Sequence, residues 1–317
     1  MEARVQERVE SELPFLPLVN FQRLLSSARK QELAVVQKGL SELGFLLLQN
    51  CIDPTLVKEA YEQMQLFFEL PMNTKIIFKM DDRYRGYDPG EQTLQMQNIT
   101  SAEAAQLKRD KKEGYRIWDP AQEAVSKDHP WWRLLGHPNK FPSKELLPDF
   151  VPIMLAYREA GANAICEIMN AIDDCPDIPP GNLKDYNDPG FMPCRPILYS
   201  EDGGSSNAHQ DWGNGTLIDT NVPGLQTVLV SEEAEVWYEV PVMEGCSVFQ
   251  LGEMAAEITG LKANRHRVRM PKESRGSKLS LVTFGYGHRD KKIGNEYCAQ
   301  KILDRFDQSY GFGRFGR

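Results

Sequence analysis

Two histidines and one aspartate have the types and spacing of metal ligands. His209 and Asp211 are two positions apart in NAHQDWGNG, and His266 lies 55 residues beyond Asp211. In an extended segment, residues i and i+2 point to the same side, so His209 and Asp211 can face one ion. Two imidazoles and a carboxylate are the ligand set of non-haem Fe(II) sites. The alternative is three ordinary polar residues, because a bare His-x-Asp arises often by chance.

Short strands are the elements expected to position these residues. After about residue 190 the chain consists of short runs rich in Val, Leu, Tyr and Phe, separated by Gly, Pro, Asn or Asp. This pattern of short strands and turns predicts a β-sandwich or β-barrel. In ANRHRVRM, alternation places His266 and Val268 on one face and three arginines on the other. The third ligand is therefore expected to face the interior from a distant strand.

The chain before residue 190 reads mostly as helix. Asp53 followed by Pro54 predicts a helix start, since Asp is a good N-cap and Pro suits the first turn. The region 81–120 is polar and contains interspersed Gly and Pro residues, which predicts loops with one short helix. The charged run KRDKKE within it predicts a solvated surface. The other expected elements are helices over 27–44, 150–172 and 295–311, a strand over 45–50 and a frayed tail over 312–317, for which a functional lid is the alternative.

Composition restricts the class of partner. The 317 residues are 41% hydrophobic and 26% charged with a formal net charge of -8, which argues against nucleic acid or an anionic membrane as partner. No apolar run approaches the roughly 20 residues that span a bilayer, and the start lacks a secretory signal. Six scattered cysteines without a CxxC pair indicate reduced thiols. We therefore expect a cytoplasmic protein, a monomer or weak homo-oligomer, that acts on a small molecule.

Several stretches resemble the isopenicillin N synthase-like family of 2-oxoglutarate/Fe(II)-dependent dioxygenases, over nearly the full length of the chain. The most specific are the His209–Asp211 strand with its following Thr-Leu run and the segment that ends in His266-Arg-Val. One departure is Cys51, which stands where the family often has histidine. The other stretches that carry the resemblance are GFLLLQN (44–50), FFELPMNTK (67–75), RGYDP (85–89), KEGYRIW (112–118) and KLSLVTFGYG (278–287).

The resemblance implies a mainly β (α+β) fold, with a double-stranded β-helix (jelly-roll) core and flanking helices. It implies a mostly helical region over 1–190, the oxygenase core over 191–290, and a C-terminal helix and tail over 291–317. It also implies Fe(II) held by His209, Asp211 and His266, with 2-oxoglutarate and O2 as cosubstrates and ascorbate as an optional reductant.

The expected 2-oxoglutarate site departs from the family pattern. The family binds the distal carboxylate with Arg-x-Ser, and the aligned residues here are Lys278 and Ser280. Lysine supplies the charge as a point donor, whereas arginine grips a carboxylate with two parallel hydrogen bonds. Arg275 with Ser277 is a second Arg-x-Ser, but it precedes the apolar run, so Lys278 is preferred. Tyr199 matches a family tyrosine that faces the cosubstrate; the alternative is a half-buried barrel tyrosine.

Three functions remain open at this point. The first is a 2-oxoglutarate-dependent dioxygenase that hydroxylates, desaturates or cyclises a small molecule. The second is an iron oxidase of the same fold that works without 2-oxoglutarate, an alternative prompted by Lys278. The third is a non-catalytic binding protein, which the intact ligand set disfavours.

Overall fold

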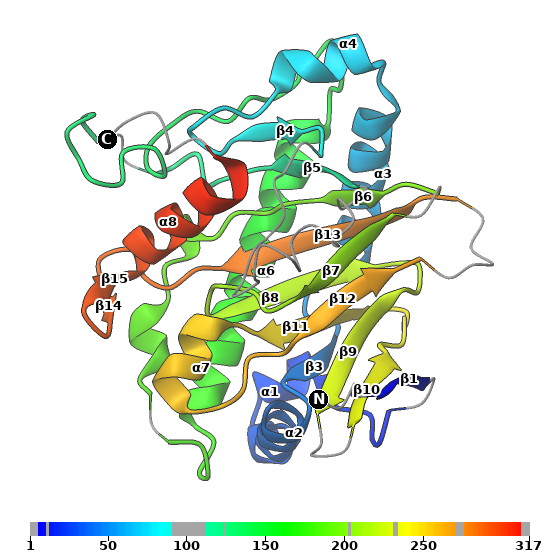
Figure 1. The fold of residues 1–317 in the computed structure, drawn as a ribbon, viewed down its shortest axis with the longest axis vertical. Coiled ribbons are helices and arrows are strands. Elements are labelled where there is room, and N and C mark those ends of the chain that lie inside the picture. The colour runs from blue at the N-terminus through cyan, green and yellow to red at the C-terminus, as the bar shows by residue number, and fades with distance from the viewer. Residues whose placement is uncertain are drawn as a thin grey trace, which may run out of the picture.

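Two facing β-sheets form the centre of the protein (Figure 1). The computed structural model describes residues 6–10, 13–90, 112–122, 125–179, 181–201, 204–230, 234–270 and 276–311. The strands are β1 (Gln6–Glu10), β2 (Leu18–Asn20), β3 (Phe45–Gln49), β4 (Gly86–Asp88), β5 (Lys112–Arg116), β6 (Ile197–Tyr199), β7 (Ser205–His209), β8 (Gly215–Thr220), β9 (Leu225–Val230), β10 (Ala234–Glu239), β11 (Cys246–Leu251), β12 (His266–Arg269), β13 (Lys278–Gly285), β14 (Lys292–Ile293) and β15 (Glu296–Tyr297).

The larger sheet has the strand order β2-β3-β11-β8-β13-β6-β5-β4, and the smaller has the order β1-β10-β9-β12-β7. Side chains from the inner faces of both sheets pack into one apolar cluster, which includes Ile218, Val248 and Val282 from the larger sheet and Leu225 and Val268 from the smaller. Strands β2 to β5, which precede residue 190, belong to the larger sheet, so the helical first part of the chain and the later β part share one sheet.

Helices cover the outer face of the larger sheet and one end of the sheets (Figure 1). The long helix α6 packs on β8 and β13, and α3 packs on α6. Among the described residues, none of the helices combines the length and apolar character needed to span a bilayer. The helices are α1 (Phe21–Leu24), α2 (Arg29–Glu42), α3 (Pro54–Glu69), α4 (Met72–Lys75), α6 (Phe150–Asp173), α7 (Glu253–Thr259) and α8 (Cys298–Tyr310), with 3-10 turns at Ile76–Phe78, Leu183–Tyr186 and Pro189–Phe191.

The predicted N-cap and the helices predicted over 27–44, 150–172 and 295–311 are confirmed. The Asp53 carboxylate accepts a hydrogen bond from the Thr55 backbone N–H at 2.8 Å, and Pro54 occupies the first helical position. Gly161 lets α6 approach the sheet closely, because a Cβ there would lie 2.5 Å from Thr283 Oγ1. The predicted tail, most of the region 81–120 expected as loop, and Arg275 lie outside the described residues.

One stretch within 81–120 was predicted wrongly. The sequence indicated loops and a solvated charged run, whereas β4 and β5 form an edge of the larger sheet. Lys112, the first residue of β5, is 8% exposed, and Arg116, the last, is 3% exposed. These cations are buried because β5 pairs with β6 and its inner face turns toward the space between the sheets.

Candidate metal centre

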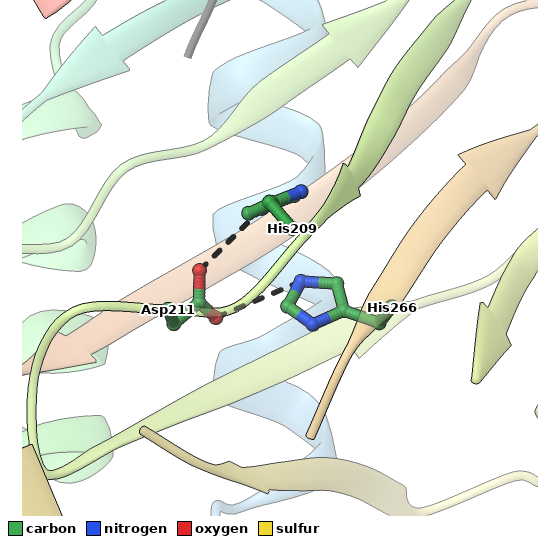
Figure 2. A group of neighbouring side chains, drawn as sticks. All are labelled: His209, Asp211 and His266. Carbon is green, nitrogen blue, oxygen red and sulfur yellow. Dashed lines mark ion pairs between the residues drawn. The ribbon is translucent and has the colours of Figure 1, made fainter. Parts of the chain in front are cut away.

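His209, Asp211 and His266 meet between two neighbouring strands of the smaller sheet (Figure 2). His209 ends β7 and His266 begins β12, and the two are direct partners in the antiparallel register. Their ring centroids are 4.4 Å apart. Nε2 of His209 lies 3.6 Å from Asp211 Oδ1, and Nε2 of His266 lies 3.7 Å from Asp211 Oδ2. The three side chains offer ligand atoms that all lie within 4.8 Å of one another.

Backbone carbonyls orient both imidazole rings. Nδ1 of His209 lies 2.7 Å from the Asn207 oxygen, and Nδ1 of His266 lies 3.2 Å from the Asn264 oxygen. A carbonyl only accepts, so each Nδ1 donates its hydrogen, and each Nε2 is the nitrogen turned toward Asp211. Metal-bound histidines commonly have this outer hydrogen bond, which fixes ring orientation and tautomer.

The protonation states also suit a divalent cation. Burial lowers the pKa of His266 to about 4, so its ring is neutral at pH 7. Burial alone would raise the pKa of Asp211, but the adjacent His266 and His209 hold it below its ordinary value. Two imidazoles and one carboxylate are the ligand set of non-haem Fe(II) and leave coordination positions for other ligands.

The first turn of α7 fixes the loop that carries Asp211. The Glu253 N–H donates to the Asp211 carbonyl at 2.8 Å, and the Met254 N–H donates to the Gly213 carbonyl at 3.0 Å. Gly252 is required beside them, because a Cβ there would lie 2.1 Å from the Gly213 oxygen. The distant segment after β11 therefore positions the carboxylate.

The triad lines a cavity between the sheets with about 870 Å³ of empty space, including the part open to solvent. Tyr199, Lys278 and Ser280 line the same cavity. Lys278 is 1% exposed, and its Nζ donates to the Thr220 hydroxyl and the Val222 carbonyl. Burial lowers the pKa of Lys278 to about 8. No acidic side chain of the described residues forms an ion pair with it.

Sequence reasoning missed several polar and aromatic residues of this cavity. Lys112 and Arg116 come from β5, and Arg195 lies just before β6. Phe306 and Tyr310 come from α8, which closes one end. The alternation of Lys112, Gly114 and Arg116 in KEGYR is the signal that could have placed two cations on one face of a strand.

Comparison with known proteins gives consistent matches. The family described as non-haem dioxygenase in morphine synthesis N-terminal matches residues 16–144. The 2-oxoglutarate-dependent dioxygenase traH of Penicillium crustosum is 24% identical over 96% of this chain and 96% of its own length. Kihadalactone A synthase LFS of Citrus sinensis is 26% identical over 79% of this chain and 77% of its own length.

Solved structures show the same fold. A full-length Neurospora crassa protein, solved by crystallography in complex with alpha-KG, superposes with a TM-score of 0.73 at 20% identity, covering 92% of this chain and 95% of that one. A 2OG-Fe(II) oxygenase family protein of Caulobacter crescentus superposes with a TM-score of 0.71 at 18% identity, covering 92% and 98%. The predicted jelly-roll core with flanking helices is therefore confirmed.

The fold is that of solved 2OG-Fe(II) oxygenases, and its cavity contains a His-Asp-His group of the type that binds iron in non-haem oxygenases, which are oxidoreductases. Along almost its whole length the chain is similar to a 2-oxoglutarate-dependent dioxygenase, and its first part matches the N-terminal family of non-haem dioxygenases.

Proposed function

We propose that this protein uses Fe(II), O2 and 2-oxoglutarate to oxidise a small organic molecule, with His209, Asp211 and His266 as the iron ligands. The observation that carries the proposal is the convergence of the three ligand atoms in a cavity that also holds a buried lysine. The bound iron and 2-oxoglutarate supply the oxidising chemistry, in which 2-oxoglutarate yields succinate and CO2 while the substrate is oxidised.

Lys278 is the proposed partner of the distal carboxylate of 2-oxoglutarate. It lies on β13 in register with Tyr199 of β6, and Ser280 lies two residues along the same face. A buried ammonium that donates to a hydroxyl and a carbonyl is stabilised strongly by a carboxylate. Tyr199 and Ser280 line the same cavity, and we expect their hydroxyl groups to add hydrogen bonds to the same ligand.

The chain's remaining task is to exclude water and orient the substrate. Apolar and aromatic side chains occupy the part of the cavity wall that α8 and the end of β13 build. Water-poor surroundings strengthen the electrostatic contacts that hold reactants in place. The aromatic residues of this wall are Phe284, Tyr286, Phe306 and Tyr310, and Trp212 lines the cavity from the loop beside Asp211.

The test is the visible charge-transfer absorption of the anaerobic protein with Fe(II) and 2-oxoglutarate. A weak band that saturates with 2-oxoglutarate is expected from chelation of the iron by the 2-oxoacid. His209→Ala should abolish both the band and stoichiometric iron binding, while Lys278→Ala should keep iron and need more 2-oxoglutarate. The absence of a band at saturating 2-oxoglutarate would contradict the proposal.

Lys278 also motivates a second candidate function. An iron oxidase of the same fold that works without 2-oxoglutarate has no need for the family's arginine at this position. Succinate released in step with oxygen consumption supports the dioxygenase, whereas substrate oxidation without added 2-oxoglutarate supports the oxidase.

We also propose that the protein works in a reducing compartment, the cytoplasm, as a monomer or weak homo-oligomer. All six cysteines are free thiols, which supports such a compartment. Sedimentation at several protein concentrations tests the oligomeric state.

A further inference from the structure

One buried cation of the cavity has no acidic partner among the described residues and uses little of its hydrogen-bonding capacity. Arg116 ends β5, lines the cavity, and is 3% exposed. Its Nη2 donates to the Tyr310 hydroxyl at 3.1 Å. Its Nε and Nη1 are buried and have no hydrogen-bond partner in the part of the chain that the structure describes. Three N–H groups of a permanently charged guanidinium are thus available to a ligand.

The neighbouring cations of the cavity, Arg195 and Lys112, have clear partners. Arg195 forms an ion pair with Asp88 at 2.9 Å, and both side chains are buried. Lys112 donates to the Ser206 hydroxyl at 3.0 Å. Asp211, the acid among the described residues that line this cavity, is already the proposed iron ligand. Burying an unpaired charge is costly, so Arg116 is expected to be paired when the cavity is filled.

Aromatic rings hold the Arg116 side chain in place. Its guanidinium carbon lies 4.3 Å from the ring centre of Phe306 and 5.4 Å from that of Tyr310, both on α8. Such contacts satisfy the flat faces of a guanidinium and leave its edge, where the N–H groups point, for another partner. An edge with several N–H donors matches the two oxygens of a carboxylate.

Arg116 is separated from the proposed 2-oxoglutarate site in the direction in which the strands run. Lys112, Tyr199 and Lys278 form one row across β5, β6 and β13 in the sheet register. Arg116 is four residues further along β5, which corresponds to about 13 Å at the usual rise per residue. A five-carbon diacid spans only about 6 Å between its ends at about 1.5 Å per bond. The two side chains also have partners in different parts of the fold, since Lys278 Nζ donates to Thr220 and Val222 near the end of β8 and Arg116 Nη2 donates to Tyr310 on α8. This arrangement favours a different carboxylate at each place.

We propose that Arg116 binds a carboxylate of the primary substrate, whose apolar body lies against the aromatic wall formed by α8 and the end of β13. This inference rests on the proposed function of the same cavity and names its substrate class, apolar or aromatic carboxylic acids. Arg116 is then a specificity residue: it binds the end of the substrate that is remote from the bond to be oxidised.

The experiment compares acids with their uncharged amides. Phenylacetate, 3-phenylpropanoate and 4-phenylbutanoate, each paired with its primary amide, are titrated anaerobically into the protein loaded with Fe(II) and 2-oxoglutarate, with calorimetry as the readout. At least one acid should bind roughly tenfold more tightly than its amide, as expected for a hydrogen-bonded charge pair. Arg116→Gln should remove that preference, and Arg116→Lys should keep part of it.

A matched control removes a cation outside the cavity. Arg305 on α8 forms an ion pair with Glu253 at 3.0 Å and does not line the cavity, so Arg305→Gln should keep the preference for acids. The proposal is overturned if no acid binds more tightly than its amide, or if Arg116→Gln leaves the preference intact. It is also overturned if Arg116→Gln weakens the binding of 2-oxoglutarate and leaves the preference for acids unchanged. Loss of the Fe(II)–2-oxoglutarate absorption band in the unmodified protein would instead count against the function proposed above.

Discussion

The affinity for 2-oxoglutarate is predicted to fall as the pH rises through about 8, because Lys278 loses its proton there. Burial lowers the pKa of Lys278 to about 8, and the charge of Glu239 opposes this only in part. An ordinary lysine titrates near 10.4. The carboxylate of 2-oxoglutarate binds the protonated form of Lys278. The affinity for 2-oxoglutarate is therefore expected to fall once the pH exceeds the pKa that Lys278 has in the ligand-free protein.

The size of the effect follows from the fraction of Lys278 that is protonated. With a pKa of about 8, that fraction falls from about nine-tenths at pH 7 to about one-tenth at pH 9, which weakens binding about tenfold, or about 1.4 kcal/mol. With an ordinary lysine pKa, the same change of pH would alter affinity by only a few per cent.

The assay is anaerobic titration of the Fe(II)-loaded protein with 2-oxoglutarate between pH 6.5 and 9, followed by calorimetry and by the visible band. Lys278→Arg is the matched control, since arginine stays protonated throughout this range. The control separates titration of Lys278 from any change at the iron. A dissociation constant that is flat from pH 7 to 9, or equally pH-dependent in Lys278→Arg, would refute the reasoning and favour Arg275 as the carboxylate partner.

Three further outcomes are expected. His209→Ala should bind less than one equivalent of Fe(II) by metal analysis; full occupancy would remove His209 from the ligand set. Asp53→Ala should lower the free energy of unfolding by about 1 kcal/mol in urea, because Thr55 N–H loses its cap; an unchanged midpoint would show that the cap contributes nothing. Gly161→Ala should cost about 1–3 kcal/mol through its contact with Thr283, and Thr283→Ala should restore much of that loss; destabilisation that Thr283→Ala leaves unchanged would contradict the packing argument.

The helices and the His-x-Asp strand could be predicted because their signals are local. Asp53 and Pro54 are adjacent in sequence, and His209 and Asp211 need only the alternation of an extended segment. The contacts of Lys278 carry no local signal, since Thr220 and Val222 lie 58 and 56 residues away. The division of the chain at residues 190 and 290 stays a prediction.

Strand β5 shows why the substrate end of the cavity was harder to predict. A strand with one buried face is expected to alternate apolar and polar residues, but the inner face of β5 carries Lys112, Gly114 and Arg116. Cations are buried there because they meet partners that arrive from β7 and α8. Functional residues interrupt the alternation of apolar and polar residues. Reasoning from that alternation therefore predicts that such a strand is exposed to solvent.

The two ends of the cavity are built from different parts of the chain, and this has a consequence for specificity. The proposed metal ligands lie on β7, β12 and the loop fixed by α7, whereas Arg116 and its aromatic contacts belong to β5 and α8. Substitutions in α8 can therefore change which substrate is held while they leave the triad in place. Such a division lets binding contacts far from the reacting bond vary independently of the proposed metal site.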